Sequence, residues 1–207
     1  MATPLETASA DTLLDWMRER RSIRRYRPEP LPDGVIERLI DAARLAPSAH
    51  NRQPWRFVVL QRADQKARLA DAMGARLRAD RLADGDEPEA VEKDVASSRS
   101  RITAAPAVIA VCTTLSDMDR YPDARRAEAE RLMAVQSTAM AAQNLLLLAH
   151  AEGLGACWMC APLFCPDTVK RALEFPSDWH PQALITLGRP ASAGRQRERR
   201  AIADIVR

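Results

Sequence analysis

Apolar residues recur every three or four positions along several stretches of this chain, and this period predicts amphipathic helices. In the first stretch, Leu13, Leu14 and Met17 fall on one side. The stretch 123–151 is the longest, and because its second half is apolar on nearly all sides we expect this helix to cross the core. The helices predicted in this way cover residues 11–21, 33–46, 123–151 and 167–173.

The stretch 64–100 also has helical composition, but it is crowded with Arg, Asp and Glu and is interrupted near Gly85 and Pro88. Glycine and proline break helices, and charged residues favour the solvated face of a helix. Two solvated helices joined by a turn are therefore the natural interpretation of this stretch.

Short runs of consecutive apolar residues, several of them β-branched, predict buried strands. They cover residues 56–60, 107–112, 156–159 and 183–187. Because these strands do not alternate with helices as regular βαβ repeats, the pattern favours an α+β fold over a doubly wound one. A chain of 207 residues has room for one substantial core, so we expect a single domain over residues 1–207.

Composition excludes several classes of function. Apolar residues make up 46% and charged residues 29% of the chain, which is globular composition. The net charge is only +3 and aromatic residues reach only 4%, which argues against a nucleic-acid partner. No stretch of 18 apolar residues runs without polar interruption, so we expect no membrane span. Four cysteines without an export signal lead us to expect a cytoplasmic protein.

Three arginines and a serine fall within residues 20–24, at the end of the first predicted helix. A guanidinium group presents a planar fork of donors that matches phosphate or carboxylate oxygens. The spacing Arg20-x-Ser22-x-Arg24 at a helix end can bring several of these groups to one concave surface. Taken alone, a solvated basic run is the more common meaning of such a stretch.

The loop between Pro47 and Pro54 carries Ser, His, Asn and Gln and leads directly into a predicted core strand. Polar donors on a loop anchored to a rigid element commonly build a ligand site. An ordinary turn with side-chain to backbone hydrogen bonds is an equally open alternative. His50 has no partner histidine or triad residue in this loop, so it indicates neither a metal site nor a nucleophile by itself.

The third candidate stretch runs from Gly153 to Pro162, and its small residues allow a flat ligand to approach the backbone closely. It contains Cys157-x-x-Cys160, but this pair follows a long helix instead of opening one, as a thioredoxin-like motif requires. A fourth ligand for a metal is not evident. We therefore expect no metal site and interpret the cysteines as buried small hydrophobes.

These three stretches read RRSIRRY, PSAHNRQPWRFVVL and QNLLLLAHAEGLGACWM. In this order and spacing they resemble the nitroreductase family of FMN-dependent oxidoreductases, over nearly the whole chain. Within that family, PSAHNRQPW and ACWMCAP look closest to the flavin-binding domain fused to the ligase that finishes the deazaflavin cofactor. The ligase half has no counterpart in these residues, so its activity is not implied.

The resemblance implies a three-layer α+β fold with a central, mostly antiparallel sheet of four to five strands flanked by helices. It also implies a homodimer that binds FMN at the subunit interface, a helical lid over about residues 74–103 and a C-terminal tail over about 189–207. Reduced FMN gains negative charge at its N1–C2 edge, and fixed arginines would stabilise that charge.

The resemblance further implies which residues contact FMN. The phosphate, the ribityl chain and the pyrimidine edge would be held by Arg20, Arg21, Ser22 and Arg24. From the other subunit, the same flavin would be reached by Pro47, Ser48, Ala49 and Asn51. Along the isoalloxazine, with backbone N–H groups near N5, would lie Trp158, Met159, Cys160 and Ala161. A tail arginine, Arg199 or Arg200, would join the phosphate.

The implied activity is a ping-pong reaction. NAD(P)H would pass a hydride to flavin N5, and a nitroaromatic, quinone or flavin acceptor would then be reduced, with no catalytic side chain required. Two alternatives remain open: a relative that consumes its flavin, such as the one that makes the lower ligand of cobalamin, and a non-catalytic flavin- or deazaflavin-binding protein.

Overall fold

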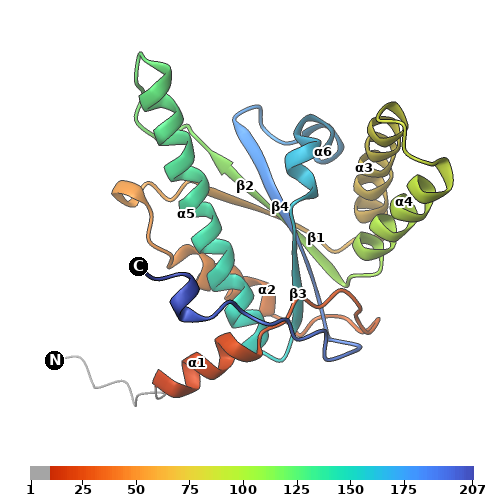
Figure 1. The fold of residues 1–207 in the computed structure, drawn as a ribbon, viewed down its shortest axis with the longest axis horizontal. Helices are drawn as coiled ribbons and strands as arrows, with labels where there is room; N and C mark the ends of the chain where they lie inside the picture. Colours follow the sequence, from red (N-terminus) through yellow and green to blue (C-terminus); the bar gives the residue numbers. More distant parts are fainter. Residues whose placement is uncertain (1–9) are drawn as a thin grey trace.

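The computed structural model describes residues 10–207. Its centre is a four-stranded antiparallel sheet in the order β1-β2-β4-β3 (Figure 1). The strands are β1 (Trp55–Leu60), β2 (Ala107–Thr114), β3 (Gly155–Met159) and β4 (Trp179–Gly188). Every residue of β2 is buried, because helices cover both faces of the sheet and leave no side for solvent.

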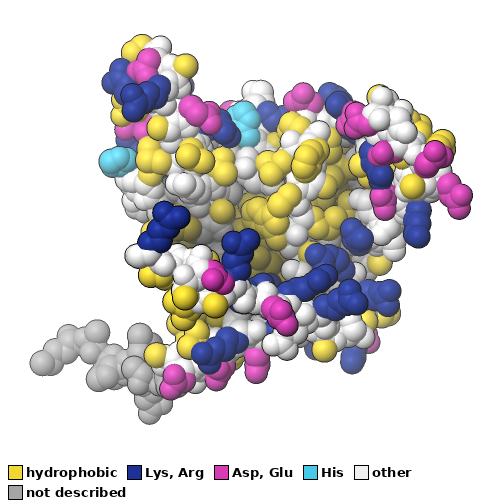
Figure 2. Space-filling model, viewed as in Figure 1, with side chains coloured by type: hydrophobic (Ala, Val, Ile, Leu, Met, Phe, Trp, Pro, Cys, Tyr) yellow, Lys and Arg dark blue, Asp and Glu magenta, His cyan; other side chains and the backbone are white. Residues whose placement is uncertain are grey.

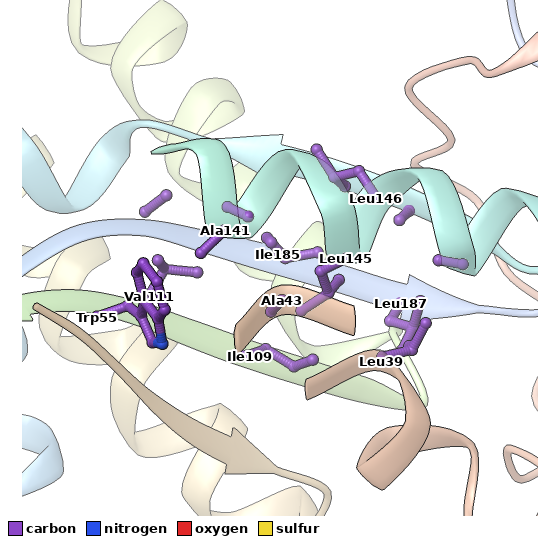
Figure 3. Packing of buried hydrophobic residues seen from close by; sticks show 14 of the residues in the cluster. Leu39, Ala43, Trp55, Ile109, Val111, Ala141, Leu145, Leu146, Ile185 and Leu187 are labelled. Atoms are coloured by element: carbon purple, nitrogen blue, oxygen red, sulfur yellow. The ribbon is translucent and has the colours of Figure 1, made fainter. Parts of the chain in front are cut away.

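Neighbouring residues of the central strands point into two different cores. Ile185 of β4 packs into the first core, beneath α2 (Val35–Arg44) and α5 (Ala124–Ala151), where it meets Leu39 and Leu145 (Figure 3). Leu184, one residue earlier, packs into the second core beneath the remaining helices. Those helices are α3 (Ala63–Ala83), α4 (Pro88–Thr103) and α6 (Pro166–Leu173). The predicted three-layer α+β fold is confirmed.

The helix α5 confirms the prediction for residues 123–151. Asp123 caps its first turn by accepting a hydrogen bond from the backbone N–H of Arg126 at 2.9 Å. By length and composition alone α5 could cross a membrane, but 44% of its most apolar window is buried inside the protein. Leu145 is fully buried between α2 and the sheet, so α5 is the central helix of the first core.

The helices α3 and α4 form the predicted pair, but the prediction that they are solvated is wrong for one face. Leu69 and Met73 of α3 and Val91 and Ile102 of α4 are buried, and most of them lie in the second core. These few apolar residues recur at helical spacing and pack inward, while the numerous charged residues pair with one another on the outer face.

Two boundaries differ from the prediction in informative ways. The first helix, α1 (Ala10–Glu19), ends before Arg20, because the following residues extend along the edge of β3. Strand β4 begins at Trp179, four residues before the predicted start. Pro181 lies in it opposite Cys112, at a shift in the strand register, which is where a sheet tolerates a proline. Short 3₁₀ helices also occur, η1 (Ala49–Asn51), η2 (Ala161–Phe164) and η3 (Ile202–Asp204).

Candidate functional site

The basic segment 20–24 is fixed to the edge of β3. The backbone N–H of Ile23 donates to the carbonyl of Ala156 at 3.0 Å, and Ser22 forms an isolated parallel bridge with the same residue. Gly155 permits this approach, since a Cβ at its position would lie 2.7 Å from Cγ2 of Ile23. The arginines on either side of Ile23 are therefore held on a rigid strand edge.

Tyr26 ties the same segment to the sheet. Its hydroxyl is 2.7 Å from Oγ1 of Thr186 in β4, and the side chain is partly buried. Burial raises the pKa of Tyr26 well above its usual value, so the phenol stays protonated and acts as an anchor.

The C-terminal tail lies beside this segment. The N–H of Arg27 donates to the carbonyl of Arg189 at 2.9 Å, and the N–H of Ala191 donates to that of Arg25 at 3.0 Å. Gly194 then has φ +75°, and a Cβ there would lie 2.7 Å from Cδ1 of Ile23. The absence of a side chain at Gly194 thus lets the tail cross close to the basic segment.

A hollow of about 490 Å³ lies between the basic segment and the tail. We call it the basic hollow; it is lined by Met17, Arg18, Arg20, Arg21, Ser22, Arg24, Arg195, Gln196, Arg197 and Arg199. Within residues 10–207, Arg18 is the only one of these arginines that forms an ion pair, with Asp15. Six guanidinium groups thus converge without a carboxylate, which is the donor set that a phosphate requires.

A second hollow, of about 440 Å³, meets the first at Arg24. We call it the adjoining cleft; it is lined by Arg24, Leu77, Asp94, Ser97, Ser98, Arg101, Cys157, Trp158, Met159, Cys160 and Ala161. Figure 2 shows a hollowed apolar area in the middle of one face, with a row of Lys and Arg side chains along its lower border. A flat apolar molecule with an anionic tail fits this combination.

The end of β3 supplies one wall of the adjoining cleft. Trp158, Met159, Cys160 and Ala161 all line it, so the structure brings these four predicted residues together with Arg24. The indole N–H of Trp158 donates to Sγ of Cys160 at 2.8 Å. This contact orients the thiol at the point where β3 turns into η2.

The interpretation of the cysteines as buried is correct for three of them and wrong for Cys160, which is exposed. The strand ends at Met159, so the next residue leaves the sheet. Burial raises the pKa of Cys157 and Cys165, and raises that of Cys112 to about 12, so these three remain thiols at neutral pH. In the part of the chain that the structure describes, no group of three or more His, Cys, Asp or Glu could hold a metal ion.

The loop with Pro47, Ser48, Ala49 and Asn51 lies apart from the arginines. The N–H of Ala49 approaches Oγ of Ser137 in the middle of α5 at 3.4 Å. Arg20 and Arg21 instead line a small cavity with Leu146, nine residues further along α5, or about 14 Å by the rise of a helix. A single chain therefore does not bring the two predicted halves of the site together.

The loop itself has an unusual backbone. His50, Asn51 and Gln53 have φ angles of 49°, 54° and 50°, the left-handed region that non-glycine residues seldom adopt. Oγ of Ser48 accepts a hydrogen bond from the N–H of Gln53 at 3.0 Å and closes the turn. Left-handed conformations of this kind occur at ligand-binding sites, whereas the Ser48–Gln53 hydrogen bond is the feature expected of an ordinary turn, so the geometry of the loop agrees with both interpretations.

Two tail arginines of the basic hollow were not predicted from the sequence, Arg195 and Arg197. They line it together with Arg199, whereas Arg200 is not among its lining residues. The signal was present in the alternation of Arg195, Arg197 and Arg199, because alternate side chains of an extended segment point to the same side. Four cleft residues of α4 were also missed, Asp94, Ser97, Ser98 and Arg101.

Comparison with known proteins identifies the family. The family model described as "Nitroreductase family" matches residues 17–189. The chain belongs to the nitroreductase family. The resemblance drawn from the three sequence motifs is therefore confirmed.

Named relatives in this family cover most of the chain. A 5,6-dimethylbenzimidazole synthase of Rhodobacter capsulatus is 35% identical over 190 residues, which are 89% of this chain and 86% of that protein. A second protein of this name, from Rhodospirillum rubrum, is 33% identical over 87% of this chain and 81% of its own length. An NADH dehydrogenase of Thermus thermophilus is 30% identical over 91% of each chain.

Solved structures share the fold. A nitroreductase candidate from Desulfovibrio desulfuricans, determined in complex with FMN, superposes with a TM-score of 0.72 at 29% identity, over 97% of this chain and 96% of that chain. A BluB-like flavoprotein from Clostridium difficile gives a TM-score of 0.78 at 23% identity, over 94% and 97% of the two chains. The second likeness shows the fold alone, and the first agrees with the expected cofactor.

Proposed function

We propose that this protein binds FMN without a covalent bond and acts as an oxidoreductase. The observation that carries the proposal is the set of six arginines that converge in the basic hollow without a carboxylate partner among residues 10–207. The basic hollow opens into the apolar end of β3 at Arg24. The FMN complex of the structure from Desulfovibrio desulfuricans supports the choice of cofactor.

Different residues of this chain would bind different parts of the cofactor. The FMN phosphate would be bound in the basic hollow by Arg20, Arg21 and Ser22, with Arg199 from the tail. Each charge-assisted hydrogen bond contributes about 1.5–3 kcal/mol net. Three or four such bonds, with burial of the ring, could reach the roughly 8 kcal/mol of a micromolar complex after the cost of association.

Arg24 lies where the basic hollow meets the adjoining cleft, so its guanidinium would reach the pyrimidine edge of the flavin. FMN, when bound, supplies reversible hydride transfer at N5. An arginine keeps its positive charge at every physiological pH, so it stabilises negative charge at the N1–C2 edge without a proton transfer. Trp158, Met159, Cys160 and Ala161 would line the ring and present backbone N–H groups.

The helices α3 and α4 would form the lid of this site. Leu77 of α3 and Ser97, Ser98 and Arg101 of α4 face the end of β3 across the adjoining cleft. A lid in this position excludes water from the reacting ring and leaves room for one small molecule at a time. In the overall reaction, NAD(P)H and one proton would reduce a nitroaromatic, quinone or flavin acceptor by two electrons and two protons.

A second copy of the chain would complete the site. The loop with Pro47, Ser48, Ala49 and Asn51 lies too far along α5 to reach the basic hollow of its own chain, so we propose that it contacts the flavin of the partner in a homodimer. Apolar side chains remain exposed on the tail and on α5, at Ile202, Ile205, Val206, Leu132 and Met140. Burial of these residues would stabilise the dimer.

The test begins with the purified protein and FMN. We expect yellow protein, or a colourless protein whose melting temperature rises when FMN is added, because a ligand of the native state stabilises it. Oxidation of NADH and NADPH is then followed with a nitroaromatic, a quinone and free flavin as acceptors. A colourless protein that gains no stability from excess FMN would contradict the proposal at its first step.

One specific observation favours a second candidate. Two relatives at 33% and 35% identity carry the name 5,6-dimethylbenzimidazole synthase, so this chain could use reduced flavin as a substrate instead of a recycled cofactor. Incubation with reduced FMN in air separates the two functions. Recovery of intact FMN supports the oxidoreductase, whereas appearance of 5,6-dimethylbenzimidazole in the products supports the synthase.

A further inference from the structure

The face of α4 that borders the adjoining cleft carries a compact group of donors. Ser97, Ser98 and Arg101 line the adjoining cleft, and their spacing of three and four residues puts them on one side of the helix. Two hydroxyl groups and a guanidinium thus face the end of β3, where the flavin ring is expected under the proposed function.

Arg101 stands out from the other arginines of the lid. Each of the others on α3 and α4 has a carboxylate partner, in the pairs Arg68–Glu174, Arg76–Asp80, Arg78–Glu92, Arg81–Asp86, Arg81–Asp94 and Arg99–Asp71. Arg101 has none among residues 10–207. Among the arginines of the two helices, Arg101 is therefore the one without a carboxylate partner in the described residues, and it lies on the side that borders the cleft.

The remaining charges of the adjoining cleft do not neutralise Arg101. Asp94 is its one acidic lining residue, and its carboxylate accepts a hydrogen bond from the guanidinium of Arg81. Arg24 is the other basic lining residue, and the proposed function assigns it to the flavin. Arg101 is thus the ionised group of the adjoining cleft that remains without a role.

An apolar space adjoins this group of donors. A cavity of about 110 Å³ shares Leu77, Ser98 and Ala161 with the adjoining cleft and is closed by Met73 and Phe164. Phe164 is 80% exposed, so its ring is available to a ligand at the mouth of this cavity. A molecule with an anionic end at Arg101 and an apolar ring would find both of its parts accommodated.

We propose that the electron acceptor of this protein carries an oxyanion, a carboxylate or a phosphate, that is bound by Arg101 together with the hydroxyls of Ser97 and Ser98. This inference rests on the proposed function, because it names the class of molecule that the flavin reduces. A guanidinium matches a carboxylate or a phosphate with two parallel N–H···O bonds. It also raises the local concentration of anions at the mouth of the cleft.

The test compares acceptors that differ in charge and little else. Purified holoenzyme, supplied with NADH or NADPH as the hydride donor, reduces 4-nitrobenzoate, 4-nitrophenyl phosphate or the neutral 4-nitrobenzamide. Each nitro group accepts two electrons and two protons, supplied as a hydride from NAD(P)H and one solvent proton, and releases one water to give the nitroso product. The variant is Arg101→Gln, and the matched control is Arg99→Gln, on the same helix but paired with Asp71 at 2.7 Å. Bound FMN per chain is measured for every protein, and binding of 4-nitrobenzoate is measured by calorimetry.

Arg101→Gln is expected to lower kcat/KM for an anionic acceptor about tenfold relative to 4-nitrobenzamide, with unchanged FMN content. The affinity for 4-nitrobenzoate should fall by a similar factor, and Arg99→Gln should change neither quantity. A larger effect for the phosphate than for the carboxylate would identify the source of the oxyanion. The inference would be overturned if Arg101→Gln lowered kcat/KM equally for charged and neutral acceptors, if it lowered kcat/KM for none of them, or if the variant lost its bound FMN.

Failure of the proposed function would look different. A wild-type holoprotein that reduces none of the three compounds contradicts the oxidoreductase, and the calorimetric comparison of wild type with Arg101→Gln still decides whether Arg101 binds an oxyanion. Weak binding of 4-nitrobenzoate that is equal in both proteins would then contradict the anion site as well.

Discussion

The basic hollow and the outer face of the α3–α4 pair are both rich in arginine, yet they differ in what surrounds each guanidinium. On the helix pair, Arg78 binds Glu92 through two hydrogen bonds of 2.5 and 2.8 Å, and Arg99 binds Asp71. In the basic hollow, Arg20 and Arg24 face further arginines and no carboxylate among the described residues. Paired arginines balance charge at a surface, whereas unpaired arginines that converge indicate an anion supplied from outside.

This contrast has an energetic side. Exposed ion pairs contribute little to stability, because water already solvates both partners. Converging cations repel one another, so the arrangement persists only because backbone contacts hold the basic segment against β3 and the tail. A bound anion relieves that repulsion, and mutations in the two regions should therefore affect different measurements.

The largest expected effect comes from Arg20→Ala combined with Arg24→Ala. Loss of two charge-assisted hydrogen bonds should weaken FMN binding by at least about 100-fold. Fluorescence titration of apoprotein with FMN measures this change. The control is Arg76→Ala with Arg78→Ala, which removes two paired arginines of α3 and should leave FMN affinity unchanged. Flavin retention in the first double variant equal to that of the wild type would remove the phosphate assignment.

A smaller effect separates the two candidate arginines of the tail. Arg199 lines the basic hollow and Arg200 does not. Arg199→Ala should weaken FMN binding about tenfold, the value of one charge-assisted hydrogen bond, while Arg200→Ala should have almost no effect. The same titration measures both variants. The opposite ranking would mean that the tail adopts another register when the flavin is bound.

Smaller still is the effect of Arg99→Ala on stability. The ion pair between Arg99 and Asp71 is exposed. Its loss should therefore lower the free energy of unfolding by less than about 1 kcal/mol, with no change in FMN affinity. Denaturant unfolding of the apoprotein measures the first quantity. A decrease of several kcal/mol in the free energy of unfolding would show that the paired arginines contribute substantially to stability, and would weaken the contrast between the two regions.

The smallest effect depends on pH. The guanidinium of Arg78 lowers the pKa of Glu92 below its usual value, so the pair stabilises the folded state above the unfolded pKa, and that stabilisation is lost as pH falls through the folded pKa. Glu92→Gln should therefore lower the melting temperature slightly at pH 7 and have no effect near about pH 3. If the difference in melting temperature between wild type and Glu92→Gln grew as the pH was lowered, the predicted direction of the pH dependence would be wrong.

Much of the fold was predictable from local pattern. The helical period of 123–151 and the apolar run 107–112 correspond to α5 and β2, since helices and buried strands impose their own spacing on hydrophobic residues. The start of β4 was not predictable, because Pro181 argues against a strand and only the register shift opposite Cys112 accommodates it. The buried face of α3 and α4 was hidden by the many charged residues around Leu69 and Ile102.

For the candidate site, the sequence by itself determined the chemical character of each part: arginine forks at 20–24, small residues and an apolar turn at 153–162, and alternating arginines in the tail. Only the tertiary structure decided that the tail lies beside the basic segment and that Arg101 borders the end of β3. The physical reason is that backbone hydrogen bonds, such as those of Arg27 with Arg189 and of Ala191 with Arg25, make this contact. Every residue type except proline carries the same backbone donor and acceptor. The pattern of side chains therefore does not indicate which distant segments will form hydrogen bonds with each other.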